Sequence, residues 1–308
     1  MPDLGQFPAI WSGRAAGFAP ADYGVRVDQH SPVIPLRPLT FGELLDAGVL
    51  LLRANARLFL VAAFVLAVCE QAVLFPLRSV AGADGTTDVF DADTGIWWLV
   101  FCCGLTTEGI VLALLGGLTG AAAGPALLGT PAPARELLRV WGRRAPALIV
   151  LAISVGLILL PSAVVALPWF YFFGAIGLAA PALVVDRVGP GAALVRSLNL
   201  APVGLRGVAI RLGGYGGWAA IRVAIGLGTA ALLDTVLPSD ALVYEIVTVA
   251  VWVLANTVVY AALASVDAVL YLESRMRVEG LDVAVGRSRR LGRPVDLAQA
   301  ALSGAVQR

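Results

Sequence analysis

Residues 40–77 read TFGELLDAGVLLLRANARLFLVAAFVLAVCEQAVLFPL, and this stretch predicts a surface helix that leads directly into a membrane span. Thr40 and Glu43 have the spacing of a capping box, which marks the start of a helix. Apolar and charged residues then occupy separate faces at helical spacing as far as Arg57. From residue 58 the polar face disappears, and only Glu70 and Gln71 interrupt an apolar run long enough to cross a bilayer.

The composition of the whole chain is that of a membrane protein. Of its 308 residues, 59% are hydrophobic and 14% are charged, whereas about a quarter of the residues are charged in soluble domains. The long apolar runs predict an all-α integral membrane protein with six transmembrane helices. We expect these helices near residues 58–77, 96–123, 147–165, 169–185, 212–233 and 242–272.

Arginine positions predict the domain organisation and the orientation. We divide the chain into a disordered cytoplasmic tail (1–36), a six-span membrane domain (37–282) and an Arg-rich cytoplasmic tail (283–308). Of the 22 basic residues, all arginine, 20 fall in the N-terminal region, the second and fourth loops (Arg211 included) and the region after residue 272. The positive-inside rule therefore places both termini in the cytoplasm and the protein in the cell membrane.

Several classes of active site are excluded by the residue types present. Without lysine, neither a nucleotide-binding P-loop nor a lysine Schiff base is available. The single histidine, His30, lies in the N-terminal tail, so no imidazole base is expected in the membrane. Cys69, Cys102 and Cys103 fall in predicted spans without zinc-ligand spacing. We therefore predict a protein that is not an enzyme and has no cofactor or metal.

Three amphipathic helices are predicted on the cytoplasmic side, before spans one, three and five. The triplets Glu43-Leu44-Leu45 and Glu136-Leu137-Leu138 occupy similar places before their spans. This suggests a threefold repeat of a helix plus a membrane hairpin, although chance similarity between amphipathic helices explains the triplets equally well.

Arginines on and beside these helices are expected to contact anionic lipid headgroups, at about 1 kcal/mol each. They are Arg53, Arg57, Arg135, Arg139, Arg143 and Arg144. The basic run near the C-terminus is short and lacks interleaved aromatic residues, so nucleic acid is not an expected partner.

Three short motifs resemble a known family. They are RPLTFGELLD at 37–46 with Arg53 and Asn55, the region 181–197 with PALVVDR and ALVRS, and YLESRMRVEGLD at 271–282. Together they are similar to a group of mainly actinobacterial multi-span proteins, whose shared region is named after the membrane domain of glycerophosphoryl diester phosphodiesterases. In the family members that are phosphodiesterases, the chemistry belongs to a separate soluble domain. The resemblance covers residues 37–282, so it implies the membrane domain without the catalytic domain.

Ionisable residues deep in the spans are the candidate functional residues. Glu70, Glu108 and Arg222 lie nearest the middle of the predicted bilayer, where a charged side chain costs about 2.5 kcal/mol or more. One hypothesis is a cluster in which Arg222 pairs with one carboxylate and the other titrates with substrate or proton. The alternative is that arginine and glutamate only lock the spans together. Asp267 and Glu245 are expected to reach water near span ends, and Asn256 to form an interhelical hydrogen bond.

Glycines repeat every four residues in two predicted spans, a spacing that permits close helix approach. They are Gly116, Gly120 and Gly124 in span two, and Gly213 and Gly217 in span five. They are expected to serve packing within the bundle, with an oligomer contact as the alternative.

For function, the sequence favours a non-enzymatic scaffold or subunit of a cell-envelope membrane complex, with membrane-protein partners or a homo-oligomer. A carrier or channel for a lipid-like or small polar substrate, lined by Glu70, Glu108 and Arg222, is the alternative. A weaker alternative is a membrane anchor for a separately encoded enzyme.

Overall fold

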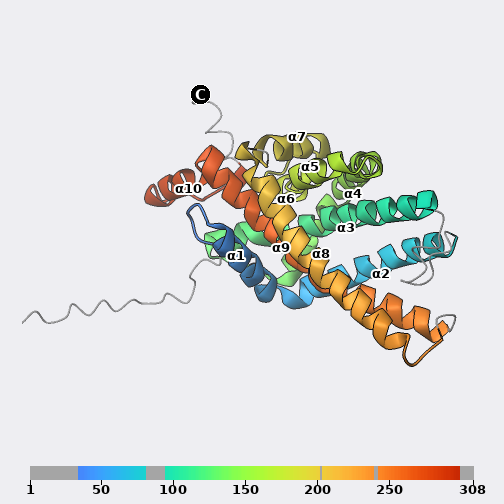
Figure 1. Cartoon of the computed structure of the whole chain (residues 1–308). Coiled ribbons are helices and arrows are strands. Elements are labelled where there is room, and N and C mark those ends of the chain that lie inside the picture. The colour runs from blue at the N-terminus through green and yellow to red at the C-terminus, as the bar shows by residue number, and fades with distance from the viewer. Residues whose placement is uncertain (1–33, 81–93, 202, 239–241, 299–308) are drawn as a thin grey trace, which may run out of the picture. The chain divides into compact units, whose positions relative to one another are not determined.

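The computed structural model describes residues 34–80, 94–201, 203–238 and 242–298. Over these ranges the regular structure is helical, with ten α-helices and a short 3₁₀-helix (Figure 1). They are α1 (Phe41–Ala54), α2 (Ala56–Val80), α3 (Thr94–Leu128), α4 (Ala134–Val164), α5 (Leu167–Ile176), α6 (Ala179–Val185), α7 (Pro190–Leu200), η2 (Val203–Leu205), α8 (Arg206–Leu233), α9 (Leu242–Glu279) and α10 (Leu281–Arg290). Most of the predicted N-terminal tail, with His30, and residues 299–308 lie outside the described residues.

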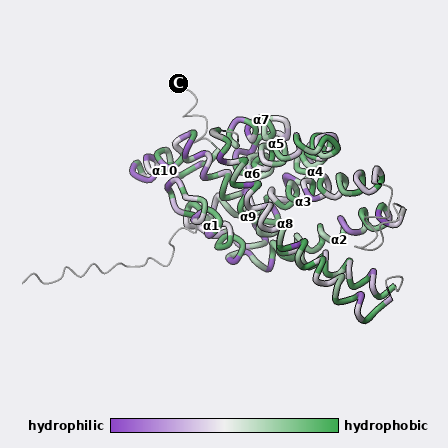
Figure 2. Tube along the Cα trace, in the orientation of Figure 1, coloured by the Kyte–Doolittle hydropathy of each residue, from purple (hydrophilic) through white to green (hydrophobic). Residues whose placement is uncertain are grey.

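Six helical segments are long and apolar enough to cross a membrane, which confirms the predicted number of spans. Their mean hydropathy runs from 1.4 to 2.6, and Figure 2 shows the apolar residues along them. The fourth segment consists of two helices, α5 and α6, separated at Gly177 and Leu178. The chain is therefore a multi-pass membrane protein.

The start of α1 has the predicted capping box. Thr40 accepts a hydrogen bond from the Glu43 amide, and the Glu43 carboxylate accepts one from the Thr40 amide at 2.9 Å. Hydrogen bonds from Arg37 and Thr40 lower the pKa of Glu43 to about 2, so its carboxylate is charged at neutral pH. Gly48 then faces α9, where an added Cβ would lie 2.7 Å from Val266. The capping box thus defines the start of α1, and the close contact at Gly48 packs the helix on α9.

Several element boundaries differ from the sequence prediction. The surface helix predicted before span three and the span at 147–165 form one continuous helix, α4. Its first part is held on α3, because the indole of Trp141 donates a hydrogen bond to the Leu114 carbonyl at 3.0 Å. Helix α9 continues to Glu279, seven residues beyond the predicted end, and Gly280 (φ 65°) then separates it from α10.

The extra turns of α9 change the placement of residues predicted in the C-terminal region. Glu273 and Arg275 lie within α9 and are fully buried. The following helix also packs on the bundle, since Leu281 and Val285 of α10 are buried. The polar region after residue 272 therefore begins as part of the packed bundle.

The two glycine stripes have different surroundings. On α3, a Cβ added to Gly116 would lie 3.0 Å from Ala180, and one added to Gly120 would lie 2.9 Å from the Pro181 Cα. Gly124 similarly faces Leu297. On α8, Gly213 has only Phe41 at 3.9 Å, and Gly217 has no atom within 4 Å among the described residues. The α3 stripe serves packing within the bundle, whereas the α8 stripe faces outward.

Replacing Gly120 by valine should destabilise the bundle, because the neighbouring atom is backbone and cannot move aside cheaply. We expect the free energy of unfolding in detergent to fall by about 1–3 kcal/mol. Gly217→Val is the matched control, with the same substitution at an open position. Equal melting temperatures for the two variants would contradict the α3–α6 contact.

Candidate functional site

Four membrane-spanning helices bring the predicted intramembrane residues together. Glu70 lies on α2, Glu108 on α3 and Arg222 on α8, and all three are buried. Asn256 and Tyr260, one helical turn apart on α9, complete the arrangement. We call the set formed by these five residues with Thr107 and Tyr215 the intramembrane network.

Glu108 and Arg222 form its charged half. Arg222 Nη2 donates a hydrogen bond to Glu108 Oε2 at 3.2 Å, and Nη1 lies 3.0 Å from Oε1, which has no hydrogen-bond partner among the described residues. The Tyr215 hydroxyl donates a further hydrogen bond to Oε2 at 3.0 Å. Because the surrounding dielectric is low, this paired geometry offsets much of the cost of burying both charges.

Glu70 forms the other half, and its partners are uncharged. Tyr260 donates to its two oxygens at 2.9 and 2.7 Å, Asn256 donates at 3.2 Å and Thr107 at 3.2 Å. Within the described chain, no arginine forms an ion pair with this carboxylate. Asn256 joins the two halves, since its side-chain oxygen accepts a hydrogen bond from Arg222 at 3.3 Å.

Glu70, Glu108 and Arg222 are the three residues of the cluster hypothesis, and Asn256 is predicted to form an interhelical hydrogen bond. The structure brings Glu108 and Arg222 into direct contact and connects Glu70 to them through Asn256. Tyr215, Tyr260 and Thr107 were not predicted. The one available signal was the spacing of Asn256 and Tyr260, which places two polar side chains on one face of a span.

A second buried ion pair corrects two predictions. Asp267 was expected to reach water and Arg211 to lie in a loop, but both are buried within spans, and Arg211 Nε donates to Asp267 at 2.9 Å. The reason is that α9 is longer, and α8 starts earlier, than the apolar runs indicate. The guanidinium also lies 4.0 Å from the centre of the Phe173 ring.

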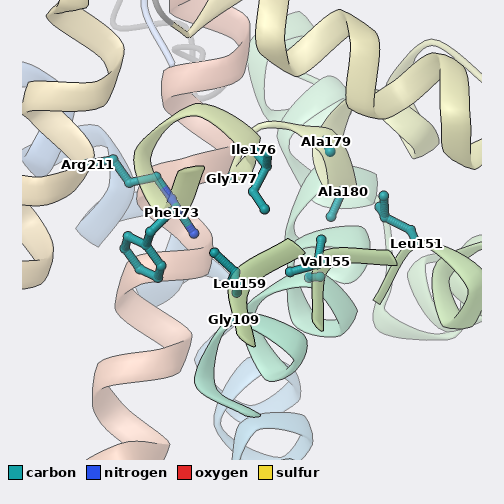
Figure 3. A pocket seen from close by; sticks show the side chains of 11 residues that line it. Gly109, Leu151, Val155, Leu159, Phe173, Ile176, Gly177, Ala179, Ala180 and Arg211 are labelled. Carbon is teal, nitrogen blue, oxygen red and sulfur yellow. The ribbon is translucent and has the colours of Figure 1, made fainter. Parts of the chain in front are cut away.

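Arg211 occupies the interruption between α5 and α6. A Cβ at Gly177 would lie 2.0 Å from its Nε, so glycine is required there for the guanidinium to fit. Figure 3 shows this guanidinium beside a small cavity with Val155 and Leu159 on its wall. Non-helical backbone at membrane depth must be shielded from lipid. The Arg211–Asp267 pair provides part of that shield, leaving Arg211 Nη1 without a hydrogen-bond partner among the described residues.

At the end of the bundle where α1 and α10 lie, a larger set of charges ties the connecting segments to α9. Asp186 accepts hydrogen bonds from Arg275 at 2.8 Å and from Tyr271, and also pairs with Arg196. Glu279 pairs with both of these arginines, Arg196 at 2.8 Å and Arg275 at 2.9 Å. Burial raises the pKa of Asp186, although its two arginines and Tyr271 act in the opposite direction.

A neighbouring set holds the start of α1. Glu273 pairs with Arg206 at 2.8 Å and with Arg277. Both arginines also donate to the Leu39 carbonyl, at 2.7 and 2.9 Å. We refer to these two sets together as the end cluster. Its residues come from all three motifs of the family resemblance and from the start of α8.

The six arginines predicted to contact lipid headgroups are distinct from all of these. Five are exposed and Arg144 is half-buried. Throughout the described ranges, none of the six has an internal hydrogen-bond or ion-pair partner. They are Arg53, Arg57, Arg135, Arg139, Arg143 and Arg144, and we call them the surface arginines.

The described residues contain no group of three or more histidine, cysteine, aspartate or glutamate side chains placed to hold a metal ion. Comparisons with protein-family models, with curated proteins and with solved structures found no match to this chain. The geometry of the site is therefore the basis for its chemistry.

Removing one member of the Glu108–Arg222 pair should destabilise the protein more than removing both. Glu108→Gln leaves a buried guanidinium without its counter-charge, at a cost of about 3–5 kcal/mol in the free energy of unfolding. In the double variant Glu108→Gln/Arg222→Met most of this loss should be recovered, because no buried charge is left unpaired. Denaturation in detergent micelles measures both. A double variant as unstable as the sum of its single variants would rule out the pairing.

Proposed function

We propose that this chain is a non-enzymatic scaffold or subunit of a cell-envelope membrane complex. The observation that carries the proposal is the division of its arginines into two populations. Those inside the bundle are matched by carboxylates or hydrogen-bond acceptors, as in Arg222–Glu108 and Arg211–Asp267. The surface arginines have no such partner within the described residues. The surface arginines are thus available to bind anionic headgroups or an acidic protein surface.

The internal contacts support a rigid frame. The intramembrane network links α2, α3, α8 and α9, and the end cluster ties α1, α7, α8 and the segment after α6 to α9. Hydrogen bonds between spans limit their relative sliding. A frame of this kind presents a fixed surface to partners, which is what a scaffold requires.

The finer topology is part of the proposal. Six spans leave both termini on one side, and the arginine distribution favours the cytoplasm. The threefold repeat is supported by α1 and α7, which are separate helices placed before the α2–α3 and α8–α9 hairpins. We also propose membership of the family that the motifs resemble, and the meeting of all three motifs in the end cluster supports treating them as one unit.

The scaffold proposal predicts stoichiometric protein partners that depend on the surface arginines. The full chain, purified in mild detergent, should retain a partner that Arg135→Gln/Arg139→Gln/Arg143→Gln loses or holds at least tenfold less well. Arg287→Gln/Arg290→Gln/Arg293→Gln, with the same change of charge in the C-terminal segment, is the matched control. Purification of the wild type with lipid alone would contradict the scaffold, and an enzyme as the partner would identify the chain as its anchor.

A carrier is the second candidate, and it is favoured by one observation. Glu70 is a buried carboxylate whose partners in the described structure are Tyr260, Asn256 and Thr107, all uncharged. A carboxylate without a fixed counter-charge changes its protonation state more easily than a paired one. In this proposal Glu70 exchanges a proton while Glu108 remains paired with Arg222.

The carrier predicts proton movement that requires Glu70. In proteoliposomes containing the wild type, an enclosed pH-sensitive dye should report acidification of the vesicle interior. Glu70→Gln should abolish this acidification. Glu245→Gln is the matched control, because it makes the same substitution in a span at a carboxylate outside the network. If Glu70→Gln and the wild type behave alike, the network is structural.

A further inference from the structure

An apolar groove runs between α2 and α9, with a volume of about 490 Å³. Phe64, Val68 and Phe75 form its α2 wall, and residues from Leu242 to Leu254 form its α9 wall. Many of these side chains are exposed in the isolated chain, for example Leu242 at 69% and Leu254 at 60%. In Figure 1 the far end of α2 and the α8–α9 hairpin lie apart.

The groove has the length of one leaflet. At about 1.5 Å per residue, residues 242–254 of α9 rise about 18 Å and residues 64–75 of α2 about 16 Å. Half of the hydrocarbon core of a bilayer is about 15 Å thick. Both walls belong to membrane-spanning helices, so the groove is surrounded by acyl chains rather than by water.

One carboxylate lies at the end of the groove near the start of α9. Glu245 is the one ionisable residue among the described residues of its lining, and it has no hydrogen-bond or ion-pair partner among the described residues. Arg78, one helical turn beyond Phe75 on α2, is not part of the lining and donates to the buried Gln71 at 3.0 Å. An unpaired carboxylate at the end of an apolar groove complements the ammonium of a phospholipid headgroup.

We propose that the groove binds one acyl chain of an amine-bearing phospholipid, drawn from the leaflet at the α2–α3 end of the bundle. The apolar walls bind the acyl chain, and Glu245 binds the ammonium. The site is separate from the surface arginines, which belong to the opposite end of the spans. It is also independent of the scaffold proposal, since a lipid in this groove neither requires nor excludes a protein partner.

A bulky side chain placed in the groove tests whether the groove binds an acyl chain. Ala250 lines it, so Ala250→Trp should displace the lipid, whereas Ala224→Trp on the exposed face of α8 is the matched control. Native mass spectrometry of protein taken from phosphatidylethanolamine nanodiscs should show one retained phospholipid in the wild type and control, and at least tenfold less in Ala250→Trp. Equal retention in all three, or a second protein copy in place of lipid, overturns the proposal.

A second measurement needs no groove variant. A phosphatidylethanolamine with a photoreactive acyl chain should crosslink to residues 64–75 and 242–254 of the wild type, and crosslinks spread evenly over all spans would contradict a specific site. The headgroup is tested with Glu245→Gln, which should reduce the preference for phosphatidylethanolamine over phosphatidylcholine at least fivefold while retaining one bound lipid. An unchanged preference removes Glu245 from the site.

Discussion

The pairing of Glu108 with Arg222 inside the spans is the interaction on which the arrangement of the bundle depends. Charged side chains in hydrocarbon are costly unless they are matched, and these two come from α3 and α8, which are far apart in the sequence. Their contact therefore fixes the orientation of the α8–α9 hairpin relative to the α2–α3 hairpin. Tyr215 and Asn256 add hydrogen bonds to this pair and extend the same constraint to α9 and, through Glu70, to α2. Glu108 Oε1 has no hydrogen-bond partner among the described residues.

Helix α9 supplies polar residues to all three sets of buried polar contacts. Asn256 and Tyr260 serve the intramembrane network, Asp267 serves Arg211, and Glu273 and Arg275 serve the end cluster. Small side chains lie between these positions, and α1 and α3 approach closely there, as Gly48 against Val266 and the Thr119 hydrogen bond to the Ala264 carbonyl show. One long helix therefore contributes to three separate sets of polar contacts.

The number of spans was predictable because hydropathy acts locally, whereas the polar contacts depend on which helices meet. The capping box at Thr40 and Glu43 and the six apolar runs are encoded within short windows, and both were correct. Helix ends are less predictable, because charged residues such as Arg211 and Glu273 indicate the end of an apolar run although the helix continues through them. Their burial follows from partners 56 or more positions away, at Asp267 and Arg206. Glu70, Glu108 and Arg222 could be identified from their position in the predicted spans alone. The link that Asn256 forms between them could not, because these residues are far apart in the sequence.

The exclusive use of arginine has a physical consequence at the buried sites and none at the surface ones. In the end cluster, Arg196 and Arg275 share Asp186 and Glu279, while Arg206 and Arg277 share Glu273 and the Leu39 carbonyl. The guanidinium favours sharing of this kind, because its five donors lie in a fixed planar fork, whereas an ammonium has three donors without that fixed geometry. At Arg139 or Arg143, which have no internal acceptor within the described structure, lysine would carry the same charge to a headgroup. The guanidinium geometry is thus used in the end cluster, and at the surface arginines only the charge matters.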